Sequence, residues 1–196
     1  MSRNQILVRN IKHLTDARYF AAMGVDWMSM ELNSDPASFM RWHTFRDWVE
    51  GVKLAAEIDA VDEMLLSKTI IDAKPDGIIL TQLLDLEGIS DAELFFDTRY
   101  VNGEKCPHDS FSIIHYDEIE AVQILDLDPS ATFVQHDWTL DVLDKLLVLG
   151  YKGGICFTGG DEDATGMRDY EVMDKLIERL KGWWVDGLMS WWVDEL

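Results

Sequence analysis

Ten polar residues stand at the ends of short apolar runs, where a parallel sheet would turn into its loops. They are Arg9, Glu31, Glu57, Thr81, Gln82, Asp97, His115, His136, Asp137 and Thr158. Carboxylates and imidazoles of this kind can transfer protons or hold a divalent cation. Singly, each of them could equally cap a helix or meet solvent. Chemistry therefore depends on whether the chain brings them to one place.

Five of these residues offer oxygen or imidazole donors: Glu31, Glu57, Asp97, His115 and His136. They are far apart in sequence and lack the local spacing that identifies a metal site, so we expect no metal ion and no cofactor. A different acid–base pair is an alternative, and so is a buried ion pair that joins Arg9 to Glu31 or Asp97.

The elements that must position these residues alternate between strand and helix patterns. The apolar runs predict strands over Gln5–Ile11, Trp27–Leu32, Val52–Ile58, Gly77–Thr81, Glu93–Arg99, Phe111–Tyr116, Thr132–His136 and Gly154–Thr158. Eight strands separated by helical stretches are typical of an α/β chain folded as a compact (β/α)8 TIM barrel, here over residues 1–181. Because such barrels usually need about 200 residues or more, some helices must be short or missing. An open flavodoxin-like sheet is the alternative.

Helix ends carry recognisable signals. Asp35 followed by Pro36 predicts a capped helix start, and Thr15 is the expected cap of the first helix. The segment that contains Thr139 predicts another start, and Gly150 the end of that helix.

Composition limits the classes of partner. The chain has 196 residues, 47% hydrophobic content and a formal net charge of −20, so its field would repel nucleic acid. It has two cysteines and no apolar leader or membrane-spanning run, which favours the cytoplasm and argues against membrane binding.

Several segments are similar to phosphoribosylanthranilate isomerase. They are Thr158–Glu162 with Thr165–Asp169, Ile11–Ala17 with Ala21–Asp26, Pro75–Leu80, and Leu94–Thr98. The resemblance implies a (β/α)8 barrel and an Amadori rearrangement of an aminoaldose phosphate in tryptophan biosynthesis. Its substrate would be a small molecule that carries a sugar phosphate.

The resemblance also assigns roles at the site. Asp97 matches the general acid of the family, whereas Arg9 and Leu7 stand where the family has its basic cysteine and an accompanying lysine. An arginine stays protonated and cannot act as a base. Glu57 or His136 would have to replace the base, and enzyme status is left open.

Phosphate binding is implied for only half of the family's cradle. Thr158, Gly159 and Gly160 remain at the eighth strand, and Gln82 is placed with them as a substrate-binding candidate. The other glycine pair is replaced by residues 136–137, which include an aspartate unfavourable to phosphate. Two alternatives therefore stand beside the isomerase: a barrel enzyme for another small substrate, and a non-catalytic binding or assembly protein.

A tryptophan-rich tail over residues 182–196 follows the predicted barrel. Trp-Trp-Val-Asp occurs in it twice, and a helix would place Trp184, Leu188 and Trp191 on one stripe. So much apolar surface requires a partner. We expect the tail to pack on its own barrel or to form a homodimer.

Overall fold

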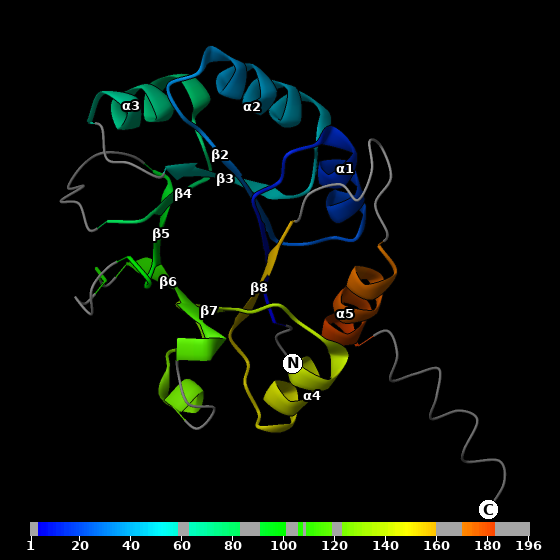
Figure 1. The fold of residues 1–196 in the computed structure, drawn as a ribbon. Coiled ribbons are helices and arrows are strands. Elements are labelled where there is room, and N and C mark those ends of the chain that lie inside the picture. The colour runs from blue at the N-terminus through cyan, green and yellow to red at the C-terminus, as the bar shows by residue number, and fades with distance from the viewer. Residues whose placement is uncertain are drawn as a thin grey trace, which may run out of the picture.

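The eight predicted strands form a closed parallel barrel. The computed structural model describes residues 4–58, 63–82, 91–100, 106–107, 109–118, 123–159 and 170–182. Each strand pairs with its neighbour in chain order, and the last pairs with the first (Figure 1). The strands are β1 (Ile6–Arg9), β2 (Trp27–Glu31), β3 (Lys53–Ile58), β4 (Gly77–Leu80), β5 (Glu93–Asp97), β6 (Ser110–His115), β7 (Thr132–Gln135) and β8 (Gly154–Thr158). The barrel prediction is confirmed, and closure excludes the open flavodoxin-like sheet.

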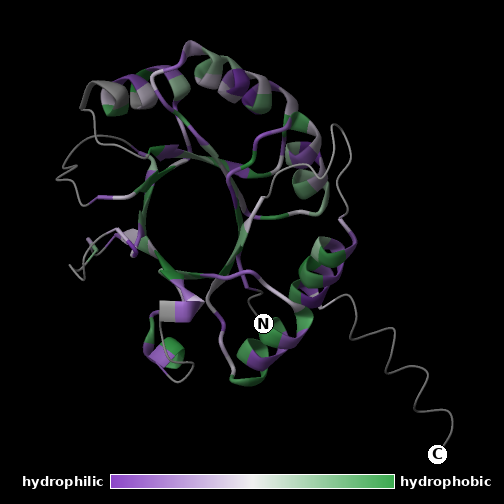
Figure 2. Cartoon of the chain, in the orientation of Figure 1, coloured by the Kyte–Doolittle hydropathy of each residue, from purple (hydrophilic) through white to green (hydrophobic). Residues whose placement is uncertain are grey.

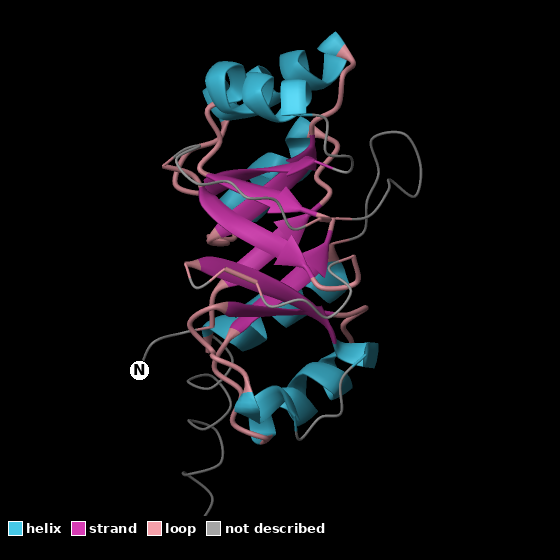
Figure 3. Ribbon diagram, turned by 90° about the vertical axis from the view of Figure 1, so that its left-hand side faces the viewer, coloured by secondary structure: helices cyan, strands magenta, loops and turns pink. Residues whose placement is uncertain are grey.

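Five α-helices accompany the strands in the described residues. They are α1 (Leu14–Ala22), α2 (Pro36–Trp48), α3 (Glu63–Lys68), α4 (Leu140–Val148) and α5 (Glu171–Lys181). A π-helical turn, η1 (Thr69–Ala73), follows α3, and two 3-10 turns, η2 (Tyr116–Glu118) and η3 (Gln123–Asp126), lie between β6 and β7. Figure 3 shows helices on two opposite sides of the strands. Short helices and 3-10 turns let this small chain close a full barrel, as expected from its length.

The strands are apolar on both faces because one face fills the barrel and the other meets the helices. The interior is filled by Leu7, Trp27, Ala55, Ile79, Phe95, Ile113, Phe133 and Cys156. A larger cluster lies between the barrel and its helices and includes the fully buried Phe20, Trp42 and Leu143. Figure 2 shows the long hydrophobic stretches around the barrel wall. Strands buried on both faces are the pattern of parallel sheets.

The helix ends confirm the predicted cap at Asp35 and the helix start predicted near Thr139, and they correct the cap predicted at Thr15. The Asp35 side chain accepts the amide of Ala37 at the start of α2, and Thr139 caps α4. Thr15, however, lies inside α1, whose N-cap is His13 in an extended conformation without a side-chain capping bond. The expected cap was therefore wrong, because α1 begins one residue before Thr15.

The described part of the chain has no helix with the length and apolar character needed to cross a membrane. Residues 183–196 of the predicted tail lie outside the described residues, as do 83–90, 101–105 and 160–169.

Candidate functional site

A layer of polar side chains closes the interior of the barrel at the C-terminal ends of the strands. Each polar residue of the layer stands two positions after an apolar residue of the interior. This spacing keeps the two side chains on one face of a strand. The members of this layer are Arg9, Ser29, Glu57, Thr81, Asp97, His115, Gln135 and Thr158. The site in such barrels is built at this end.

Arg9 lies at the centre of this layer. Its Nη1 donates to Asp97 Oδ2 at 2.6 Å, and its Nη2 donates to Glu57 Oε2 at 2.7 Å. Two more hydrogen bonds run from Nε to Glu57 Oε2 at 3.2 Å and from Nη1 to Gln135 Oε1 at 2.8 Å. Only 11% of the Arg9 side chain is exposed. The guanidinium thus joins β1 to β3, β5 and β7 across the mouth of the barrel.

The Glu57 carboxylate is held from two sides. Its Oε2 receives both bonds from Arg9, and its Oε1 accepts the backbone amide of Asn10 at 2.9 Å and the Ser29 hydroxyl at 2.5 Å. Asn10 presents that amide from a left-handed conformation with φ of 58°. Both oxygens of Glu57 are therefore committed to contacts within the protein, and the orientation of the carboxylate is fixed.

Asp97 is the second carboxylate on Arg9 and is almost fully buried. Its Oδ1 lies 2.9 Å from His115 Nε2 and 3.2 Å from the backbone amide nitrogen of Arg99. Burial by itself would raise the pKa of Asp97, but the hydrogen bonds from His115 and Arg9 and the charge of Arg9 outweigh it and lower this pKa. Burial also acts to lower the pKa of Arg9, yet Glu57 and Asp97 hold it above its ordinary value. At neutral pH Asp97 is a carboxylate and Arg9 a cation.

Gln135 extends the network to β8. Its Oε1 accepts from Arg9, and its Nε2 donates to the Thr158 hydroxyl at 3.1 Å. Sequence reasoning missed this residue and selected its neighbour His136. The signal that could have found Gln135 is the interior residue Phe133, because a side chain two positions further along a strand lies on the same face.

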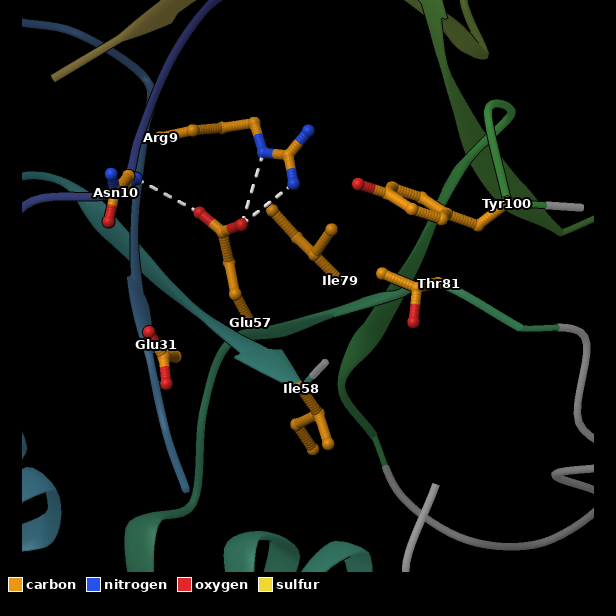
Figure 4. A pocket seen from close by; sticks show the side chains of 8 residues that line it. All are labelled: Arg9, Asn10, Glu31, Glu57, Ile58, Ile79, Thr81 and Tyr100. Atoms are coloured by element: carbon orange, nitrogen blue, oxygen red, sulfur yellow. Dashed lines mark hydrogen bonds and ion pairs between the residues drawn. The ribbon is translucent and has the colours of Figure 1, made fainter. Parts of the chain in front are cut away.

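A cavity of about 190 Å³ opens beside the Arg9–Glu57 pair. It is lined by Arg9, Asn10, Glu31, Glu57, Ile58, Ile79, Thr81 and Tyr100. Figure 4 shows Glu57 pointing at the Arg9 guanidinium, with the Tyr100 hydroxyl directed toward it from the other side. Glu31 lies on the rim, where its Oε1 accepts from Asn33 Nδ2 at 2.8 Å. The cavity combines a few polar groups with apolar walls, as small-molecule sites do.

Of the residues selected from sequence, Arg9, Glu57, Asp97, His115 and Thr158 come together in this network, and Thr81 and Glu31 line the cavity beside it. His136 does not join them. Its ring packs against Tyr116 and Trp138, with centroids at 5.1 and 5.3 Å, and its Nδ1 lies 3.3 Å from Asp117 Oδ1. Asp137 and Gln82 are exposed and do not line the cavity. The substitute base expected at His136 therefore points away from the barrel interior.

The remaining half of the phosphate cradle is partly described. Gly159 donates its amide to the Arg9 carbonyl at 2.6 Å, so this N–H serves strand pairing rather than an anion. A Cβ at Gly159 would lie 2.8 Å from the same carbonyl, which explains the glycine by close strand packing. Gly160 lies outside the described residues.

The acidic and imidazole side chains of the site are also potential metal ligands. Among the described residues, no group of three or more histidine, cysteine, aspartate or glutamate side chains is arranged to hold a metal ion. Asp97 contacts His115 directly, and Arg9 lies between Asp97 and Glu57. The guanidinium of Arg9 therefore occupies the point where the carboxylates of Glu57 and Asp97 converge.

No family model matches the sequence, and no curated protein matches it either. Solved structures do. A monomeric form of the dimeric phosphoribosylanthranilate isomerase of Thermotoga maritima superposes with a TM-score of 0.69 at 10% identity, over 91% of this chain and 99% of that one. The Pyrococcus furiosus isomerase gives 0.69 at 9% identity, with coverage of 91% and 99%.

A third isomerase was solved with reduced 1-(o-carboxyphenylamino)-1-deoxyribulose 5-phosphate and gives a TM-score of 0.68 at 12% identity, over 91% of this chain and 99% of that one. Likeness at this level of identity establishes architecture, and it confirms the resemblance drawn from the sequence at that level. The chain has the fold of phosphoribosylanthranilate isomerase.

Proposed function

We propose that this barrel does not catalyse the isomerisation of phosphoribosylanthranilate, and that its mouth binds a small polar molecule that is neutral or cationic. The observation that carries the proposal is the Arg9 network. One guanidinium stands at the position of the family's base and holds both carboxylates that could take part in proton transfer.

The isomerase reaction needs an acid that opens the ribose ring and a base that removes the proton from C2. Arg9 cannot accept a proton, and Asp97 has a lowered pKa, so it holds no proton to donate at neutral pH. Both Glu57 oxygens are engaged by Arg9, Asn10 and Ser29. Since each positioned proton transfer contributes roughly 10²–10⁴-fold, loss of both removes about 10⁴–10⁸-fold of the rate.

The charge of the site disfavours a phosphorylated ligand. Glu31, Glu57 and Asp97 supply three carboxylates around the cavity and the network, against the single guanidinium of Arg9. Two like unit charges about 4 Å apart repel by about 4 kcal/mol at the effective dielectric of a protein surface. The sugar phosphate expected from the resemblance would meet this repulsion. The backbone amide of Gly159 would not offset it, because that amide donates to the Arg9 carbonyl.

The size and lining of the cavity favour a small ligand with hydroxyl or amine groups. Its volume of about 190 Å³ is below the roughly 300–1000 Å³ typical of sites for drug-sized molecules. Glu31 and Thr81 offer acceptors at the rim, Tyr100 offers a hydroxyl, and Ile58 and Ile79 form apolar walls. These groups suit a neutral polyol or a short amine.

Binding can be tested by thermal unfolding with three probes at millimolar concentration: ribose, putrescine and ribose phosphate. A ligand that binds only the folded chain raises its melting temperature. We expect stabilisation by ribose or putrescine and none by ribose phosphate, and we expect Glu31→Gln to weaken the response to putrescine. Stabilisation by ribose phosphate alone would contradict the proposed charge preference. The absence of any response to the other two probes would count against a binding role.

A further inference from the structure

A second concave surface lies outside the barrel mouth, and its role does not depend on the proposed function. An open groove of about 590 Å³ runs beside α4 and is lined by Tyr116, Asp141, Asp144, Lys145, Val148 and Leu149. Two of its apolar side chains are strongly exposed: 83% of Val148 and 42% of Leu149. Val148 is on the outer side of α4, since Leu143 and Leu146 on its other side are fully buried, and Leu149 directly follows the helix.

The last described helix, α5, packs beside the helix that lines this groove. Helices α4 and α5 follow adjacent parallel strands, so both end at the same end of the barrel. Arg179 of α5 donates to Asp144 of α4 at 2.6 Å, which fixes the two helices side by side. Gly182, with φ of +73°, ends α5 and turns the chain. The described chain therefore ends at Gly182, three residues after the contact of Arg179 with α4.

These fourteen residues have the composition that such a groove would accommodate. They contain four tryptophans, at 183, 184, 191 and 192. Each aromatic side chain buries roughly 150–250 Å² when it packs, whereas a monomer rarely exposes a contiguous apolar patch above a few hundred Å². In a helix, Trp184, Leu188 and Trp191 share one stripe, and Asp186 lies on the opposite side. An apolar stripe backed by acid is the form that docks into a groove.

We propose that residues 183–196 pack along α4 of their own chain as an antiparallel helix, with Trp184, Leu188 and Trp191 in the groove. The lengths agree. At 1.5 Å per residue the tail spans about 21 Å as a helix, and the nine residues of α4 span about 14 Å. Neighbouring helices lie about 8–10 Å apart, so a few residues after Gly182 suffice to reach the groove. A segment tethered this closely has a high effective concentration at its site, which favours its own chain over a second copy.

The test is a double-mutant cycle between the groove and the tail. Val148→Asp puts a charge into the groove at an exposed position, and the tail is removed by truncation after Gly182. Met40→Asp is the matched control, because Met40 is 69% exposed on α2, on the opposite side of the barrel (Figure 1). Melting temperatures of all chains are measured together with sedimentation velocity.

We expect Val148→Asp to lower the melting temperature of the full chain by about 3 °C or more and to have little effect on the truncated chain, whereas Met40→Asp acts equally in both. The full chain should sediment as a monomer. An equal effect of Val148→Asp in both chains would overturn the proposal. Coupling found only in a full chain that sediments as a dimer would overturn it as well, because the groove would then hold the tail of a second copy.

If the truncated chain does not fold, the tryptophan fluorescence of the full chain provides a second measurement. In the full chain, Val148→Asp should increase the quenching of tryptophan fluorescence by acrylamide, because docked tail tryptophans would become accessible. Unchanged quenching would refute the docked tail, since Val148 itself is exposed and its substitution leaves the core intact.

Discussion

Removal of the Arg9 guanidinium tests the physical basis of the network. Arg9→Met keeps an unbranched side chain but leaves the carboxylates of Glu57 and Asp97 without their cation. The exposed fractions of the Arg9, Glu57 and Asp97 side chains are only 11%, 18% and 3%. Loss of one partner from a buried ion pair costs about 3–5 kcal/mol. For a chain of this size, such a loss lowers the melting temperature by about 6–20 °C.

The pH dependence of this loss separates an electrostatic cause from a packing defect. In the wild type the lowered pKa of Asp97 gives stability that persists at neutral pH and is lost as pH falls below its ordinary value of about 4. In Arg9→Met, burial still raises the pKa of Asp97 and only His115 still lowers it. This pKa is therefore higher than in the wild type, and the stability of the variant falls less, relative to the wild type, as pH decreases toward it. The difference between the two proteins should therefore be largest at pH 7 and smaller at pH 5.

Urea denaturation at pH 7 and pH 5 provides the assay, with Arg46→Met as the matched control. Arg46 pairs with Asp76 at 2.9 Å, but their side chains are 40% and 36% exposed. Exposed pairs contribute about 0–1 kcal/mol. Arg9→Met combined with Glu57→Gln and Asp97→Asn should recover part of the loss. A loss no larger than that of Arg46→Met, or one equal at both pH values, would refute the electrostatic account.

Three further predictions concern stability. Gly154→Ala should lower the free energy of unfolding by about 1–3 kcal/mol in urea denaturation, because its Cβ would lie 2.3 Å from the Phe133 ring; an unchanged midpoint would contradict this packing. Asp35→Ala removes the cap on the Ala37 amide and should cost about 1 kcal/mol in the same assay, whereas Asp35→Asn should retain most of it. Wild-type stability should fall as pH drops below about 4, and this fall should be smaller in Asp97→Asn, since Asp97 has a lowered pKa; identical acid profiles would argue against that shift.

The barrel was predictable because its signals are local. Each strand is a short apolar run bounded by turn or helix signals, and eight such runs leave few alternatives for a chain of this length. The cap at Asp35 and the helix start near Thr139 were likewise predictable from residue type. The cap predicted at Thr15 was wrong because the N-cap of α1 is His13, which has an extended conformation and no side-chain capping bond.

The site was only partly predictable. When both faces of a strand are buried, the sequence does not show which residues point into the barrel. Phe133 and Val134 are both apolar, so β7 shows no alternation to indicate whether Gln135 or His136 faces the interior. The convergence of Arg9 on Asp97 depends on barrel closure, which places β1 opposite β5. An ion pair with Asp97 was among the alternatives, but the simultaneous contact with Glu57 was not.

The most direct test of the central claim is turnover of freshly prepared phosphoribosylanthranilate by the purified chain, followed by the loss of anthranilate fluorescence, with Asp97→Ala in parallel. We expect neither protein to exceed the uncatalysed rate, because Arg9 supplies no base and the ion-paired Asp97 supplies no proton. Turnover by the wild type that Asp97→Ala abolishes would contradict the account and show that another residue has taken over as the base.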